Sequence, residues 1–194
     1  MGSSALDEWS SGSDARLAAL HGIAVSSAPL SVEYERASGA YIVQLGAEFQ
    51  RYCRDLHRLV VIEFMDQTVT NTPDLAIQIR NALESTKLSQ GNATESSINT
   101  DFRRLGLAGL SGLAKQENSS AGGWLSNLDT LLKLRNATAH GDDQKLALLL
   151  TSFPGRDLLG LGVAWRAELD QLVTIFDRLV SIWLSGFLNI PSPW

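Results

Sequence analysis

The sequence has few of the residues that disulfides and metal sites require. In 194 residues it contains one cysteine, Cys53, and three histidines, His21, His57 and His140. A single cysteine excludes an internal disulfide and a multi-cysteine zinc site, so we expect Cys53 to be a buried small apolar residue. The histidines lie far apart in the sequence, and none stands in an H-E-x-x-H spacing. The sequence therefore predicts no metal site and no bound cofactor.

The sequence also lacks a long uninterrupted apolar run. Its most apolar stretch, 158–188, is broken by five charged residues: Arg166, Glu168, Asp170, Asp177 and Arg178. The N-terminal residues have neither the basic start nor the apolar core of a signal peptide. We therefore expect a cytoplasmic protein that does not interact with a membrane.

Positive charge is scarce, since the formal net charge is −5. This disfavours a broad basic surface for nucleic acid, because such surfaces neutralise many phosphates. Residues 103–145, however, contain six lysines and arginines and four acids, so the net charge of this segment is +2. The net charge of the rest of the chain is therefore −7. Any contact with RNA should therefore be local to this segment.

Helical periodicity dominates the rest of the chain. With 44% hydrophobic residues the chain can bury one substantial core, so we expect one main domain. Residues 1–37 are predicted to be a flexible leader with a short helix at 14–21, and residues 38–194 to be the helical domain. Apolar residues recur at three- and four-residue steps in the segments predicted as helices, and no segment alternates as a strand. The fold class is all-α, an antiparallel bundle of four to five main helices at 38–66, 73–86, 95–105, 126–140 and 157–189.

Local signals suggest where these helices begin and end. Thr72 and Pro73 are typical of a helix start, and Ser126 with Asp129 resembles a capping box. Gly141 offers the left-handed residue that commonly closes a helix. The Gly- and Ser-rich segment 107–123 is expected to be a loop or a broken helix.

One helix end carries an unusual polar cluster, Arg135-Asn136-Ala137-Thr138-Ala139-His140. Asn136 and His140 are four residues apart and share a helix face, and the arm of Arg135 is long enough to reach that face. Cleavage of RNA by internal transesterification needs a group that accepts the 2′-hydroxyl proton, a cation for the phosphate charge and a group that orients both. Histidine can accept or donate a proton near neutral pH, and arginine binds phosphate through two parallel hydrogen bonds. Asparagine can orient the histidine and the arginine. The cluster therefore indicates metal-independent ribonuclease chemistry.

The residues alone also allow a purely structural role, which is the simpler interpretation without further information. In that role Arg135 pairs with a carboxylate such as Asp142, and Asn136 bonds to the backbone. His140 then satisfies the last carbonyls of the helix.

The Arg-Asn-x3-His spacing followed by glycine resembles the Arg-x4-6-His motif of HEPN domains, in which a polar residue commonly follows the arginine. The leucine-rich helix before the motif and the long helices around it are similar too. The resemblance covers roughly 38–189, with only the motif matching residue by residue. It is nearest to the RNA-targeting HEPN branch of bacterial toxin and phage-defence systems.

This resemblance implies a homodimer in which Arg135, Asn136 and His140 of both copies form one composite endoribonuclease site. It implies cleavage that leaves a 2′,3′-cyclic phosphate or 3′-phosphate end, and an antitoxin or other regulatory partner. HEPN toxins silenced by a nucleotidyltransferase-type antitoxin carry a tyrosine shortly after the histidine. Here Gly141-Asp142-Asp143 follows, which argues against control by tyrosine modification. The alternative function is a non-catalytic HEPN module that binds a nucleotide or a partner protein.

Other polar and aromatic residues are expected to be structural. We expect His57 to be a surface or half-buried structural histidine, and Glu117 and Asp142 to be solvated loop carboxylates. The polar side of 38–66, with Glu48, Arg51, Arg54, Asp55 and Arg58, is expected to be a solvated face, and the alternative is that its arginines border an RNA path. The tryptophans Trp124, Trp165 and Trp183 are expected to anchor the core or an interface.

Overall fold

The computed structural model describes residues 2–68, 73–189 and 193–194, with only the backbone described at 68 and 73–76. Within these ranges the chain is helical and contains no strand, which confirms the predicted all-α class. The elements are α1 (Ser4–Glu8), a wider π-type turn η1 (Trp9–Ser13), α2 (Asp14–Ser26), α3 (Val32–Thr68), α4 (Pro73–Glu84), α5 (Lys87–Gln90), α6 (Glu95–Arg104), α7 (Leu110–Glu117), α8 (Ala121–Ala139), α9 (Asp143–Leu150) and α10 (Leu158–Leu188).

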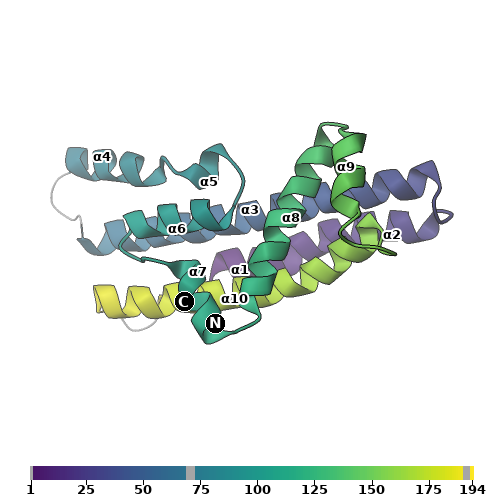
Figure 1. Ribbon diagram of the computed structural model, residues 1–194. Helices are drawn as coiled ribbons and strands as arrows, with labels where there is room; N and C mark the ends of the chain where they lie inside the picture. Colours follow the sequence, from purple (N-terminus) through teal and green to yellow (C-terminus); the bar gives the residue numbers. More distant parts are fainter. Residues whose placement is uncertain (1, 69–72, 190–192) are drawn as a thin grey trace.

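The two longest helices, α3 and α10, lie side by side and form the base of the molecule (Figure 1). Helix α8 crosses both of them, and α9 folds back along the end of α8. Helices α4, α5 and α6 pack on α3 toward its C-terminal half, while α1 and α2 pack along α3. This arrangement brings the end of α8 against the middle of α3.

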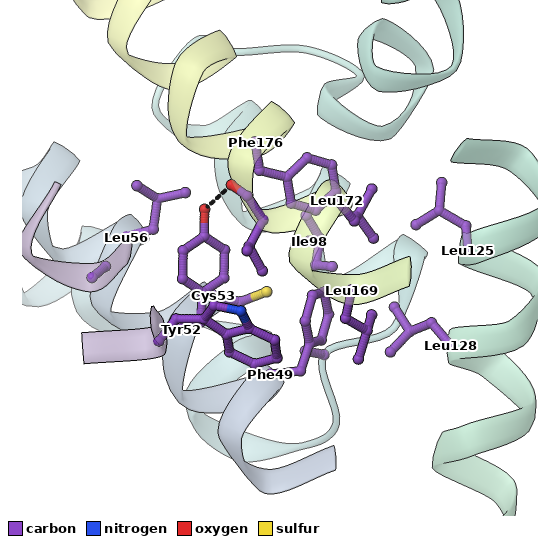
Figure 2. Close-up of a cluster of buried hydrophobic side chains, with 14 of the residues drawn as sticks. Phe49, Tyr52, Cys53, Leu56, Ile98, Leu125, Leu128, Leu169, Leu172 and Phe176 are labelled. Carbon is purple, nitrogen blue, oxygen red and sulfur yellow. Dashed lines mark hydrogen bonds between the residues drawn. The ribbon is translucent and has the colours of Figure 1, made fainter. Parts of the chain in front are cut away.

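The core forms where the apolar sides of α3, α8 and α10 meet (Figure 2). The leucines that the sequence placed on the apolar side of α8 are buried, with Leu128, Leu131, Leu132 and Leu134 at 3% exposure or less. Within this core the Tyr52 hydroxyl donates to the Val173 carbonyl at 2.7 Å, as the dashed line in Figure 2 shows. Cys53 is 1% exposed, as predicted, and burial raises the pKa of its thiol.

The predicted flexible leader is wrong for residues 3–26, which form α1, η1 and α2 on the main domain. Trp9 is 2% exposed, with the Arg166 guanidinium 4.0 Å from its ring centroid and its indole N–H donating to Asp170 at 2.8 Å. The Ser3 hydroxyl and amide both donate to the buried Asp177 carboxylate. Burial of one large aromatic ring outweighs the weak local helix preference of the Ser- and Gly-rich sequence.

Three other helix boundaries differ from the prediction. Helix α8 begins at Ala121, so the capping box predicted at Ser126 lies inside the helix. Ala121 and Leu125 are buried on the side that continues to Leu128, and this packing extends the helix through Gly122 and Gly123. Helix α3 begins at Val32 rather than 38, and α9 was not predicted. The predicted cap at Thr72 lies outside the described residues.

The expectation that Glu48 lies on a solvated face is also wrong. Glu48 is 1% exposed and accepts hydrogen bonds from Arg16 at 2.5 and 2.8 Å, Ser13 at 2.9 Å and Gln44 at 2.5 Å. Burial acts to raise the pKa of Glu48, but these donors and the charge of Arg51 lower it to about 2. Glu48 therefore joins α2 to α3 as an ionised, fully bonded carboxylate.

By length and composition alone, α10 is a helix that could cross a membrane. Core helices of soluble proteins share this composition, and α10 contains charged side chains that pair inside the protein. Arg166 is 9% exposed and pairs with Asp14 at 2.7 Å and Asp170 at 2.9 Å. In this structure α10 packs against α3, α7 and α8 as a core helix.

Glu48 should make the stability of the protein sensitive to acid. Its folded-state pKa is lowered to about 2 from an ordinary value of 4.5, so its contribution is present above pH 4.5 and is lost as the pH falls toward 2. Between pH 7 and about pH 3 the contribution should fall by about 2 kcal/mol. Urea unfolding at both pH values should show that Glu48→Gln, although less stable at pH 7, loses this part of the acid sensitivity.

The control is Glu33→Gln, which changes an exposed glutamate on the same helix. It should keep the wild-type difference between the two pH values. Equal acid sensitivity in Glu48→Gln and the wild type would contradict the assignment.

Candidate functional site

The polar cluster lies at the C-terminal end of α8, where the chain turns into α9. Gly141 adopts a φ of +64°, and its N–H donates to the Thr138 carbonyl at 3.2 Å. The N–H of Asp142 donates to the Ala137 carbonyl at 2.9 Å, which completes a Schellman closure. Gly141 therefore ends the helix as predicted, directly after His140.

Arg135 lies across the middle of α3, with its aliphatic stem over Gly46. A Cβ atom at position 46 would lie 2.8 Å from the Cδ of Arg135, so only glycine leaves room for the stem. Beyond the stem, Nη1 of Arg135 donates to the side-chain oxygen of Asn92, in the loop between α5 and α6. Close approach of α3 and α8 thus directs the guanidinium toward this loop.

Asn92 connects Arg135 to Asn136. Its side-chain NH₂ donates to the amide oxygen of Asn136 at 3.4 Å, while its own oxygen accepts from Arg135. Because the Asn92 amide bonds to both side chains, the Arg135 guanidinium lies on the side of α8 that carries Asn136. Both Arg135 and Asn136 are half-buried.

His140 is exposed at the end of the same helix. Its backbone N–H donates to the Asn136 carbonyl at 3.1 Å, so the four-residue helical relation between the two positions is kept. In the described part of the chain its side chain makes no hydrogen bond with Arg135 or Asn136. The structure thus brings Arg135 and Asn136 together through Asn92, and leaves His140 one turn further on with its imidazole open to solvent.

Arg135 differs in its partner from the other arginines that are buried or half-buried. Arg16, Arg51 and Arg166 each pair with one or more carboxylates. Among the residues that the structure describes, no carboxylate pairs with Arg135, whose hydrogen-bond partner is the neutral amide of Asn92. The positive charge of Arg135 therefore has no carboxylate partner in the described part of the chain, and the exposed His140 follows one helical turn after Asn136.

The contacts expected for a purely structural cluster are not found among the described residues. Asp142 accepts from the Lys145 backbone N–H at 3.0 Å, as the cap of α9, and does not pair with Arg135. The closing amides of Gly141 and Asp142 satisfy carbonyls at the end of α8 without the His140 side chain. The Asn136 side chain bonds to Asn92 and not to the backbone.

Neither Asn92 nor Gly46 was predicted to belong to the site. No local signal identifies them, because Asn92 is 44 residues from Asn136 in the sequence and meets it only in the folded chain. Helix α9 could have been found, since Asp142 is a typical cap and Leu146, Leu149 and Leu150 follow at helical spacing.

The other residues considered from the sequence take structural positions. His57 is 3% exposed, more buried than expected, and its ring meets Phe102 edge-on with centroids 5.4 Å apart. Burial lowers the pKa of His57, although Asp101 partly opposes the shift. Glu117 pairs with Arg178, away from the cluster. Trp165 is buried in the core, while Trp124 and Trp183 are partly buried against it.

A groove of about 570 Å³ lies on another side of α8, between Thr138, the start of α3, α9 and the start of α10. Its charged lining is mainly acidic, with Glu35, Asp143 and Asp157 against Arg36. A phosphate would be repelled there, so Arg135 and His140 form the better position for an anion.

In the described residues no three side chains of the histidine, cysteine, aspartate and glutamate types form a group that could hold a metal ion. The fold and the cluster together define an all-α protein with an uncompensated arginine and an exposed histidine at one helix end. Comparison with protein-family models, curated proteins and solved structures finds no match to the chain. The HEPN resemblance therefore rests on the motif residues alone.

Gly46→Ala should displace Arg135 without unfolding the protein. The new Cβ would lie 2.8 Å from Cδ of Arg135, so the side chain must move away from Asn92. Alanine favours a helix over glycine by roughly 0.5–1 kcal/mol, which offsets part of the crowding. We expect the free energy of unfolding in urea to stay within about 1 kcal/mol of wild type, while the side-chain NMR signals of Arg135 shift.

Gly22→Ala is the matched control, because no atom lies within 4 Å of a Cβ there. It should leave the Arg135 signals unchanged. If Gly46→Ala also left them unchanged, Arg135 could not lie across α3 as described.

Proposed function

We propose that this chain is a HEPN-type, metal-independent endoribonuclease in which Arg135, Asn136 and His140 act on one phosphodiester of RNA. The proposal depends on one observation: the neutral amide of Asn92 holds the Arg135 guanidinium and also bonds to Asn136, one helical turn before the exposed His140. An uncompensated guanidinium attracts a phosphate, and an accessible imidazole one helical turn away can move a proton if the bound RNA reaches both groups.

The reaction would be internal transesterification. His140 accepts the proton of the 2′-hydroxyl, and the 2′-oxygen forms a bond to phosphorus while the bond from phosphorus to the 5′-oxygen breaks. The departing 5′-oxygen takes a proton, and the other product carries a 2′,3′-cyclic phosphate. Arg135 would stabilise the negative charge that grows on the phosphoryl oxygens, and Asn136 would orient the phosphate through its amide.

One copy of the cluster supplies a single histidine, whereas the reaction needs both a base and an acid. We propose that the chain acts as a homodimer in which the α8 ends of two copies face each other. The second His140 then donates the proton to the departing oxygen, and the second Arg135 doubles the positive charge. The exposure of His140 is compatible with this arrangement.

The proposed biological role is that of a cytoplasmic toxin or phage-defence nuclease, controlled by an antitoxin or another regulatory protein. This role follows from the HEPN resemblance. The acidic remainder of the chain fits an enzyme that contacts RNA through a small local site and not through a broad basic surface.

His140→Ala and Arg135→Ala should each lower the rate of RNA cleavage by at least about 100-fold, because each removes a group that acts on the reacting phosphate. Purified wild-type protein should cut single-stranded RNA in the presence of EDTA and leave cyclic-phosphate ends, detected by mass spectrometry. Expression of the wild type should slow growth, and expression of either variant should not.

His21→Ala and Arg80→Ala are the controls, because they make the same changes outside 103–145 and away from the cluster. Both should cleave RNA at the wild-type rate, and sedimentation velocity should show a dimer for all five proteins. The alternative, a non-catalytic module that binds a nucleotide or partner, gains support if the wild-type dimer leaves varied RNAs intact and the variants behave identically in cells. If the protein is a monomer and leaves RNA intact, the Arg-Asn-x3-His cluster is a chance motif.

A further inference from the structure

We propose that Asn92 is a positioning residue, which fixes the direction of the Arg135 guanidinium while leaving its charge free for a phosphate. This inference rests on the proposed function and extends it to a residue outside the Arg-Asn-x3-His motif. Asn92 bonds to both neighbouring motif residues at once, through its oxygen to Arg135 and through its nitrogen to Asn136. One amide therefore sets the relative position of the two motif side chains.

The backbone that carries Asn92 is fixed on both sides. Before it, the side chain of Gln50 on α3 donates to the carbonyls of Leu88, at 3.3 Å, and Gly91. After it, Ala93 is fully buried, and the Thr94 N–H donates to the Asn92 carbonyl at 2.9 Å. Asn92 is thus presented to α8 from a loop whose two ends are both held in place.

The short helix before this loop is anchored as well. The carboxylate of Asp101, which is fully buried on α6, accepts from the N–H groups of Lys87 at 3.1 Å and Leu88 at 2.8 Å. The first turn of α5 is therefore bound to α6, and its end is bound to α3 through Gln50. A loop held in this way can impose a direction on a flexible arginine side chain.

The choice of amide over carboxylate is central to the inference. Aspartate at position 92 has nearly the same shape and would accept the same hydrogen bond from Arg135, but it would also neutralise the guanidinium. Elsewhere in the described structure, Arg16, Arg51, Arg166 and Arg178 are paired with carboxylates, and Arg104 donates to the backbone carbonyl of Ser85. At Arg135 an amide orients the guanidinium without using its charge.

Asn92→Asp tests this directly, because it keeps the hydrogen-bond acceptor for Arg135 and adds a negative charge, while it removes the NH₂ donor to Asn136. The probe is a short single-stranded 2′-O-methyl RNA, which presents phosphates but cannot be cleaved by attack of the 2′-oxygen. We expect fluorescence anisotropy to show binding about tenfold weaker than wild type, since the probe loses a charge-assisted contact. The melting temperature of Asn92→Asp should equal or exceed that of the wild type, because the new carboxylate pairs with Arg135.

Asn81→Asp is the matched control, since it adds the same charge at an exposed position on α4. It should bind the probe with wild-type affinity. Asn92→Ala should weaken binding less than Asn92→Asp does, because the guanidinium keeps its charge and loses only its fixed direction. This order of affinities would not arise from a merely structural role, in which the aspartate variant would be the milder change.

The inference is overturned if Asn92→Asp binds the probe within about twofold of the wild type while remaining folded. The proposed nuclease function would still be supported after that result if His140→Ala abolishes cleavage. Conversely, Asn92-dependent binding together with unchanged cleavage by His140→Ala would keep the phosphate site and reject the proposed chemistry.

Discussion

The packing of α3 constrains the whole molecule, because this 37-residue helix contacts the N-terminal helices, α4, α5, α6, α8 and α10. Different faces of α3 therefore pack against different neighbouring helices. One face provides the apolar residues of the core, another carries Glu48 toward α2, and a third offers Gly46 to α8. Gly46 leaves room for the Arg135 stem between α3 and α8, and this limits where the Arg135 side chain can go.

The charged side chains inside the fold differ in the groups that hold them. Glu48 is buried and ionised because it accepts hydrogen bonds from donors on both α2 and α3, so its desolvation is offset. Arg166 stacks on Trp9 and pairs with Asp14 and Asp170, which joins the N-terminal helices to α10. Arg135 alone among these groups is oriented by amides, and the proposed function and the role of Asn92 both follow from that difference.

The sequence predicted the helices whose apolar sides are long and regular, such as 38–66 and 157–189, because burial of a continuous stripe dominates their stability. It failed where local preference and tertiary packing disagree. The Ser- and Gly-rich N-terminus suggested a mobile leader, yet the burial of Trp9 holds it in place. The sequence around Ser126 suggested a helix start, yet the buried side of α8 continues back to Ala121.

Local sequence determined the end of α8. Gly141 closes the helix because glycine adopts positive φ without strain, and the four-residue spacing places Asn136 and His140 one turn apart. Tertiary structure alone decided what surrounds them: Gly46 beneath Arg135, and Asn92 between Arg135 and Asn136. These residues are brought together by the packing of α3, α6 and α8. Because such contacts join residues more than 40 positions apart, no periodicity or spacing within one segment can reveal them.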